Sequence, residues 1–323
     1  TGSITFGLSA SDPVDLIANG NFARLALATG GTVQQNGALT VNALSGRAGD
    51  VILNTITNRI AAIEGLVADG QLQVVTSGDL TVSGATSGNN GLDLTAGGAF
   101  NLTGSGSILG PNGLSLSAGA AMTLAGNVSS NRGMSLSAGP GGIALSGAIH
   151  PGQSLSISTT GALTQTGGAI TSGNLSGTAA SVSLPSRGNA LNGVGLNRDF
   201  TVSGASGDFL LVNSAPLTIG GSNPSAETAG GLFLQPGRTA TLVTDYLAIQ
   251  PSAGYRNVSV PGGTVVVTPY TLDGSVLLTS GAKPATGLSL TTTETKGIDA
   301  QALQLGTLDG NGTPTAGAIT LGR

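Results

Sequence analysis

Two aspartates beside an arginine come nearest to a catalytic arrangement in this sequence. Arg198 and Asp199 precede one short apolar strand pattern, and Asp208 precedes the next. Paired carboxylates with a neighbouring cation can supply the acid and base of glycoside cleavage or bind Ca²⁺. Yet twelve Asp and three Glu are spread over 323 residues, and Asp79 and Asp93 lie beside different strand patterns. Solvated corner residues therefore explain these carboxylates better than an assembled site does.

The remaining residues capable of specific chemistry stand alone in the sequence. His150, the only histidine, precedes Pro151 at a predicted corner, with no carboxylate close in sequence to orient it as a base. Asp309 opens the segment DGNGT, which begins like a calcium loop but lacks the bidentate Glu that such a loop requires. Glycosylation sequons arise by chance in so polar a chain, and they begin at Asn101, Asn127, Asn174 and Asn257. The sequence therefore assigns no catalytic, cofactor-binding or metal-binding residue.

The elements that position these residues follow an internal repeat, which is clearest between residues 91 and 174. Three apolar anchors recur with the same period of about 21 residues. The first anchor is Leu92, Leu114, Met134 and Leu155; the second is Phe100, Met122, Ile143 and Leu163; the third is Ile108, Val128, Ile149 and Ile170. A repeat of this length indicates a solenoid, whose units cannot bury a core alone and must stack.

Apolar and small polar residues alternate within each predicted strand. The period of two places the apolar anchors inside and the intervening residues outside. The outward positions are Asp93, Ser115, Ser135 and Ser156 after the first anchor, and Asn101, Thr123, Ala144 and Thr164 after the second. This outward ladder could bind glycans, ice or another solenoid, although simple solubility explains it more economically. The pattern predicts an all-β parallel β-helix with coils of about 20–23 residues.

The repeat extends along the chain with varying regularity. We expect a single β-helix domain over residues 1–323 of about fifteen coils, with less regular coils at 1–69, the most regular at 70–174 and looser, Pro-rich corners at 175–323. A short helix near Ile60 to Val67 is a minority alternative, because Ile56, Ile60, Ile63 and Val67 are spaced four, three and four apart. The coil period continues through this segment and favours a strand.

Composition excludes several classes of protein. The hydrophobic fraction is 39% but only 3% is aromatic, so the predicted core is thin and aliphatic. A net charge of −4 with scattered Lys and Arg argues against nucleic-acid binding. Cysteine is absent, and no apolar run approaches the length of a membrane-spanning helix. No signal peptide is visible and Thr1 is not expected to be a native start, so we interpret the chain as a mature or excised part of a longer protein.

The repeat resembles filamentous haemagglutinin-type exoproteins, which are exported by two-partner secretion. GLSLSAGAAMTLAG at 113–126, GMSLSAGPGGIALSG at 133–147 and the stretch 188–221 carry this resemblance. It implies a right-handed β-helical shaft, a bacterial source, a secreted or cell-surface location, and a role in adhesion or biofilm matrix. Implied partners are further copies of the chain in fibres, glycans or proteins of host or neighbouring cells, and an outer-membrane transporter during export. The amino-terminal secretion domain of such proteins is not identifiable.

The resulting functional prediction is a structural or adhesive fibre segment without enzymatic activity and without a cofactor. A polysaccharide-degrading β-helix enzyme and a non-catalytic glycan-binding module remain as alternatives, because both occur on the same fold. Substitution of Asp199 and Asp208 separates the enzyme from the structural protein.

Overall fold

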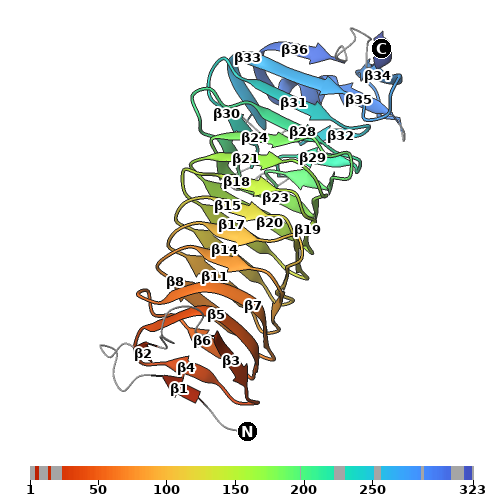
Figure 1. Cartoon of the computed structure of the whole chain (residues 1–323). Helices are drawn as coiled ribbons and strands as arrows, with labels where there is room; N and C mark the ends of the chain where they lie inside the picture. The colour runs from red at the N-terminus through yellow and green to blue at the C-terminus, as the bar shows by residue number, and fades with distance from the viewer. Residues whose placement is uncertain are drawn as a thin grey trace. The chain divides into compact units, whose positions relative to one another are not determined.

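The computed structural model describes residues 4–6, 14–15, 24–196, 198–221, 230–250, 256–284, 287–306 and 316–321. Strands hold 59% of the chain and helix 2%, and the strands stack in parallel into a β-solenoid of about 11 turns, so the predicted fold class is confirmed (Figure 1). The chain divides into two compact units, Thr1–Gln153 (unit 1) and Ser154–Arg323 (unit 2). Whether the two units form the single β-helix domain expected over residues 1–323 stays a prediction.

Unit 1 is built from three ladders of parallel strands, and each coil contributes one rung to each ladder. The first ladder contains β1 (Ile4–Phe6), β4 (Val33–Gln35), β6 (Val51–Leu53), β8 (Leu72–Thr76), β11 (Leu92–Ala96), β14 (Leu114–Ala118) and β17 (Met134–Ala138). The second contains β2 (Val14–Asp15), β5 (Leu39–Ala48), β7 (Arg59–Ala68), β9 (Leu80–Val82), β12 (Phe100–Leu102), β15 (Met122–Leu124) and β18 (Ile143–Leu145). The third contains β3 (Arg24–Ala28), the far halves of β5 and β7, β10 (Ala85–Gly88), β13 (Ser107–Leu109), β16 (Asn127–Ser130) and β19 (Ile149–Pro151).

The register in unit 1 confirms the repeat inferred from the sequence. Leu92, Leu114 and Met134 are successive partners in the first ladder, and each is at most 4% exposed. The second and third anchors also align, as Phe100–Met122–Ile143 and Ile108–Val128–Ile149. Because each apolar side chain lies directly above its equivalent, the core is a set of continuous aliphatic stacks.

The segment that also carried a helical pattern is a strand. Ile60, Ile63 and Leu66 are buried on β7, whereas Ile56 precedes the strand and is 77% exposed. Gly65 has a φ of +88°, and the pairing between β5 and β7 shifts register between Leu44 and Gly46. This irregularity offsets the apolar residues from strict alternation, which gives them a helix-like spacing. The alternative helix at Ile60 to Val67 was therefore wrong.

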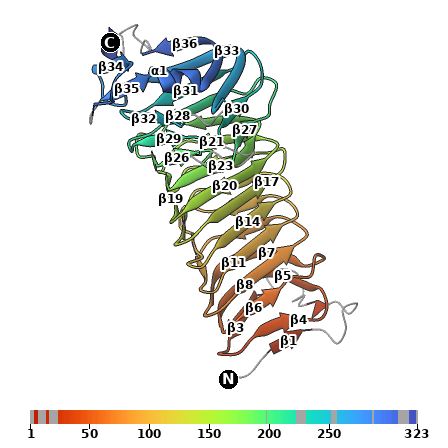
Figure 2. The same cartoon turned by 180° about the vertical axis from the view of Figure 1, so that it is seen from behind.

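Unit 2 continues with the same three kinds of ladder, seen from behind in Figure 2. The first contains β20 (Ser154–Thr159), β23 (Asn174–Ala179), β27 (Phe200–Val202), β30 (Leu232–Leu234), β33 (Val258–Thr268) and β36 (Ile298–Leu305). The second contains β21 (Ala162–Gln165), β24 (Ser181–Leu184), β28 (Phe209–Val212), β31 (Thr239–Val243) and the far halves of β33 and β36. Short strands form the third side, namely β22 (Thr171–Ser172), β25 (Ala190–Leu191), β26 (Gly193–Val194), β29 (Leu217–Ile219) and β32 (Leu247–Ile249).

Coils in unit 2 are longer than the repeat of the sequence suggested. Phe200 pairs with Leu232, and Val258 pairs with Ile298, so both of these coils exceed the period of the regular repeat. Phe209 likewise pairs with Ala240 in the next coil, which also exceeds the regular period. These long corners also explain why the solenoid has about 11 turns instead of fifteen.

The last part of unit 2 leaves the solenoid pattern. A separate three-stranded sheet contains β35 (Leu288–Thr291), β34 (Gly274–Thr279) and β37 (Ala316–Leu321), and the short helix α1 (Thr292–Lys296) follows β35. The alternation of apolar residues continues to Ile319 and Leu321 and predicts that both face inward, which was wrong, since their side chains are 53% and 78% exposed. The sequence predicts a turn at Ser11, Asp12 and Pro13 and corners at Pro224, Pro251 and Pro314. All of these lie outside the described residues.

One anchor position in the first ladder of unit 2, between Ile157 and Phe200, is occupied by a glycine, Gly177. Its φ is +119°, and a Cβ at this position would overlap the carbonyl oxygen of Ile157. In the next coil Phe200 and Phe209 are buried and make an edge-to-face contact with ring centres 5.8 Å apart. Only glycine satisfies both the backbone conformation and the close approach of the coil below.

Candidate functional site

The structure does not assemble Arg198, Asp199 and Asp208 into one site. Asp199 and Asp208 directly precede β27 and β28, which belong to different ladders of the same coil, and all three side chains are exposed. No hydrogen bond or ion pair joins these three side chains among the described residues. Partial desolvation raises the pKa of the Asp199 carboxyl. Asp208 is already engaged, because its Oδ1 accepts a hydrogen bond from the backbone N–H of Thr239 at 2.8 Å.

Asp208 is one of several aspartates that accept a hydrogen bond from the backbone of the next coil. Four aspartates at coil corners accept a backbone N–H from the following coil, which pairs successive corners where the strands have ended. The bonds run to Asp50 from Gln71 at 2.7 Å, to Asp79 from Ala99 at 2.7 Å, to Asp208 from Thr239 at 2.8 Å and to Asp245 from Thr271 at 2.9 Å. Charge-assisted bonds of this kind are stronger than neutral ones. Sequence reasoning placed such carboxylates at corners but did not identify this use.

Four further carboxylates form ion pairs that also link coils. Three of these pairs are exposed and contribute little to stability: Arg24 with Glu64, Arg47 with Asp69, and Arg256 with Asp299. The fourth joins Lys283 and Glu294 at 2.7 Å, with side chains 15% and 10% exposed. Within the described ranges, no three His, Cys, Asp or Glu side chains gather in a group that could hold a metal ion. The segment that begins at Asp309 lies outside those ranges.

The outward ladder of unit 1 forms as expected from the sequence. Asp93, Ser115 and Ser135 are successive partners in the first ladder, and Asn101, Thr123 and Ala144 are successive partners in the second. In unit 2, Ser156 pairs with Ser176, which is buried, and Thr164 pairs with Ser183. Burial raises the pKa of the Asp93 carboxyl, and a 3.4 Å hydrogen bond from the Thr95 hydroxyl opposes part of this shift. The ladder is a nearly uncharged strip of hydroxyl and amide groups.

The histidine and the sequons have mixed surroundings. His150 lies within β19 beside Ser129, so its predicted place at a corner was wrong, and its side chain is exposed. Asn101 and Asn127 are exposed, whereas Asn257 is fully buried and cannot accept a glycan. Asn174 exchanges two hydrogen bonds with the backbone of Leu196, at 3.0 and 3.2 Å.

Buried amides are a structural feature that sequence reasoning missed. Asn58 is fully buried and bonds Gln35 through both amide atoms, at 2.7 and 2.8 Å, as well as the backbone N–H of Leu39 at 2.8 Å. Asn189 repeats this arrangement in unit 2 with Gln165 and the N–H of Ile170, at 2.9 Å each. Each amide pair joins neighbouring coils. An Asn or Gln recurring once per coil was therefore the feature of the sequence that could have identified these buried amides.

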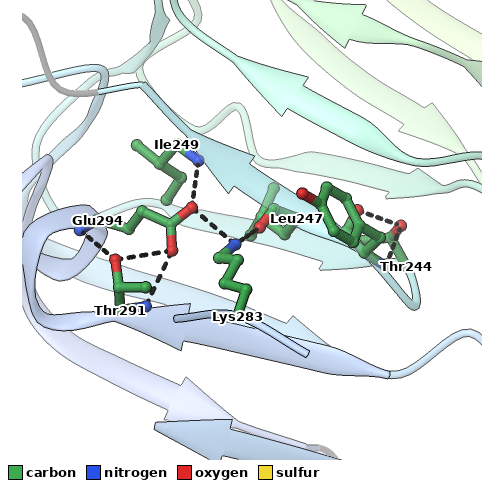
Figure 3. Close-up of polar contacts among 7 residues, drawn as sticks. Thr244, Leu247, Ile249, Lys283, Thr291 and Glu294 are labelled. Carbon is green, nitrogen blue, oxygen red and sulfur yellow. Dashed lines mark hydrogen bonds and ion pairs between the residues drawn. The ribbon is translucent and has the colours of Figure 1, made fainter. Parts of the chain in front are cut away.

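The buried ion pair of unit 2 forms a cap on the edge of β32 (Figure 3). Glu294 Oε1 accepts the backbone N–H of Ile249 at 3.2 Å, and Lys283 Nζ donates to the carbonyl of Leu247. Glu294 Oε2 accepts from the N–H and hydroxyl of Thr291, at 2.9 and 3.0 Å, in a capping box at the start of α1. Lys283 also lies 5.2 Å from the centre of the Tyr246 ring. The Thr-x-x-Glu spacing was the sequence signal for this box.

Two open grooves are lined by polar residues. The groove in unit 1 has a volume of about 560 Å³, and its polar lining includes Thr40, Asn42, Arg59, Ser77 and Asp79. Arg59, Asn42, Ser77 and Asp79 are exposed, and the small residues Ala61 and Gly78 lie between them. A second groove of about 500 Å³ in unit 2 is lined by residues that include Asp245, Tyr246 and Thr271. Both could hold a hydrogen-bonding ligand of the size of a sugar.

Comparisons with family models, curated proteins and solved structures find no match to this chain. In the part of the chain that the structure describes, no helix has the length and apolar character needed to cross a membrane.

Proposed function

We propose that this chain is a structural and adhesive segment of a bacterial fibre that is secreted or exposed at the cell surface. The observation that carries the proposal is the use of the carboxylates. Asp50, Asp79, Asp208 and Asp245 each hold the next coil, and four others are paired with cations. These eight carboxylates thus hold neighbouring segments of the fold together, which is the role expected of them in a structural protein.

The proposed mechanism is mechanical. Backbone ladders along the solenoid resist bending and stretching, because each coil is hydrogen-bonded to the next on three sides. The outward faces carry Ser, Thr and Asn with few charges, so they can approach another polar surface closely without desolvating ions. Contact with glycans or proteins of host or neighbouring cells, or with further copies in a biofilm matrix, belongs to this proposal. Export through an outer-membrane transporter rests on the resemblance of the repeat alone.

An adhesion assay tests this function directly. Beads coated with the chain are expected to bind bacterial or epithelial cells more strongly than beads coated with albumin, and free chain should compete. Thr123→Lys places a charge in the middle of the outward ladder and should weaken binding, whereas Arg132→Lys keeps the charge of an exposed corner and should not. Coated beads that bind no cell type above the albumin control would contradict the adhesive role.

A glycan-binding module is the second candidate, and the groove of unit 1 favours it. Arg59, Asn42 and Asp79 offer donors and acceptors around a floor that contains Ala61 and Gly78. Titration calorimetry with oligosaccharides selected on a glycan array would test this function. Arg59→Ala should abolish binding at this groove, and Arg132→Ala, which removes an exposed arginine elsewhere on unit 1, should leave it intact.

The enzymatic alternative is tested by a screen against uronate-containing and neutral polysaccharides. Asp199→Asn and Asp208→Asn should leave any measured turnover unchanged if these residues are structural. Turnover that is lost on either substitution, in a chain that retains its circular dichroism spectrum, would overturn the structural proposal.

A further inference from the structure

Arg187 and Tyr270 make a contact that skips two coils of unit 2. Arg187 lies in the corner that follows β24 and Tyr270 in the corner that follows β33, and the corners after β28 and β31 lie between them. Because successive coils are about 4.8 Å apart, the two side chains bridge about 14 Å along the stack. The cap on β32 joins positions 45 apart in the sequence, whereas Arg187 and Tyr270 are 83 apart.

Each of these two residues binds the backbone of the other. Arg187 Nη2 donates to the carbonyl of Tyr270 at 2.6 Å, and the Tyr270 hydroxyl donates to the carbonyl of Arg187 at 2.8 Å. The guanidinium also lies 4.2 Å from the centre of the Tyr270 ring, where a cation–π attraction adds to the hydrogen bonds. The carboxylate of Asp245 holds the next residue, because it accepts from the N–H and the hydroxyl of Thr271 at 2.9 and 2.5 Å. We call residues 269–273, which these contacts hold, the strap.

The strap leads directly into the three-stranded sheet of β34, β35 and β37, here called the side sheet. A tight turn ends the strap, because the N–H of Gly274 donates to the carbonyl of Thr271 at 3.1 Å and Asp273 has a φ of +59°. β34 begins at Gly274. The contacts of the strap therefore fix the point at which the side sheet leaves the solenoid.

A second attachment holds the side sheet to the solenoid, and it is the cap on β32. Lys283 follows β34 and Glu294 follows β35, and both side chains bind the backbone of β32 (Figure 3). These two side chains are 15% and 10% exposed, whereas Arg187 is exposed and Tyr270 is half-buried. Separating an exposed pair costs less than breaking a buried one. The strap is therefore the attachment that opens more readily.

The groove of about 500 Å³ in unit 2 lies between the solenoid and the side sheet. Asp245 and Tyr246 line it from the solenoid, Ser275 and Leu288 line it from the side sheet, and Thr271 lines it from the strap. Leu288 is only 2% exposed. A movement of the side sheet away from the solenoid would widen this groove and expose Leu288.

We propose that the strap is a latch that holds the side sheet closed against the solenoid. Release of the contact between Arg187 and Tyr270 lets the strap and the side sheet swing outward while the cap on β32 stays in place. Segments held by few, exposed contacts open locally at a lower free energy than the core does. The latch controls how much of the groove a ligand can reach, so it goes beyond the proposed structural and adhesive role.

Thiol labelling measures this opening, because the chain contains no cysteine of its own. Leu288→Cys places a thiol in the buried part of the groove lining, and its rate of reaction with iodoacetamide reports how often the groove opens. In the full chain, Arg187→Ala and Tyr270→Ala should each raise this rate by about tenfold, because each removes one hydrogen bond and the cation–π contact. Tyr270→Phe keeps the ring and should raise the rate less.

Two matched variants separate the latch from general loosening of unit 2. Arg238→Ala removes an arginine whose Nε donates to Pro236 within its own corner, at 3.4 Å, and should leave the labelling of Leu288→Cys unchanged. Leu242→Cys places a thiol in the core of β31, where Leu242 is fully buried. This core thiol should react equally slowly with and without Tyr270→Ala.

Hydrogen exchange provides a second measurement that needs no cysteine, and it decides if Leu288→Cys fails to fold. Tyr270→Ala should reduce the protection of residues 271–279, which comprise the end of the strap and β34. Peptides that cover β32 should keep their protection, because the cap on this strand stays closed.

Three outcomes would overturn the latch. The first is a labelling rate of Leu288→Cys that neither Arg187→Ala nor Tyr270→Ala changes. The second is an equal rise in labelling at Leu242→Cys, which would show that the whole unit loosens. The third is a loss of protection in β32 as large as that in β34, which would show that the cap and the strap open together.

Discussion

At the scale of single residues, buried side-chain amides hold the corners of the coils. Asn58 and Asn189 each accept a backbone N–H and each donate to both a Gln side chain and a backbone carbonyl. Asn213 satisfies the N–H and the carbonyl of Leu191 in a third corner, at 2.7 and 2.9 Å. Fully satisfied amides of this kind select one register, because a slip of one residue would leave several buried polar groups without partners.

Replacing Asn58 tests this role. Asn58→Ala would leave the N–H of Leu39 and the side-chain oxygen of Gln35 without their partner, and we expect a loss of about 2–4 kcal/mol in the free energy of unfolding. Urea denaturation followed by circular dichroism measures this loss. Asn101→Ala, at an exposed position of the outward ladder, should change stability by less than about 0.5 kcal/mol. Equal effects of the two substitutions would contradict a structural role for the buried amide.

Asp93 gives a pH-dependent prediction at the same scale. Because burial raises its pKa in the folded chain, the unfolded chain loses this proton at a lower pH, and ionisation of Asp93 opposes folding near neutral pH. Asp93→Asn should therefore raise the unfolding midpoint near neutral pH. The gain should vanish below the ordinary pKa of about 3.9, where both states are protonated. Ser135→Asn, two coils further along the same ladder, should show no such pH dependence.

At the scale of elements, the ends of strands and ladders need polar partners from elsewhere. Corner aspartates supply them between successive coils, and the Lys283–Glu294 pair supplies them at the edge of β32. These contacts join residues 20 to 45 positions apart in the sequence. Removing one member of a buried ion pair leaves the other charged and desolvated, which costs more than removing both.

The cap on β32 is tested by single and double substitution. Glu294→Ala should destabilise the β32–β35 region by about 3–5 kcal/mol, and Lys283→Met combined with Glu294→Leu should cost less than this single change. Hydrogen exchange of peptides covering β32 and α1 measures the effect. Asp299→Ala, which breaks the exposed pair with Arg256, should cost at most about 1 kcal/mol. A double variant that loses more protection than Glu294→Ala would contradict the capping role.

At the scale of the molecule, the strands of each coil pair with the equivalent strands of the neighbouring coils in its unit. Leu242 on β31 lies in a stack between Leu211 and Val267 and is fully buried. Stability in such an array is a sum of coil and interface contributions, so damage should remain local. The buried leucines thus set the stability of particular rungs.

A cavity in one coil tests this locality. Leu242→Ala should cost about 2–5 kcal/mol and should reduce hydrogen-exchange protection most in β28, β31 and β33, with a smaller loss in β24. Thr241→Ala, on the outward side of the same strand, should leave protection nearly unchanged. A uniform loss of protection throughout unit 2 would show that its coils unfold as one cooperative body instead.

The sequence alone determined the period, the class of fold and which residues face inward in the regular coils. Leu92, Leu114 and Met134 could be aligned because alternation with period two and a repeat of about 21 residues are local properties of the chain. The same reasoning could not identify the partners of Asp208, Asn58 or Glu294. Each of these residues contacts a partner in another part of the fold. The number of residues between the two partners depends on the lengths of the corners, which vary from coil to coil.

Only the tertiary structure decided where the stack is irregular. The helical spacing around Ile60 belongs to a strand because Gly65 interrupts its alternation, and Leu303 carries the pattern of a core residue although its side chain is 36% exposed. An apolar residue at an inward position is buried only if another coil lies above it. Whether a coil covers a given residue depends on the tertiary structure, and the period of the sequence does not reveal it.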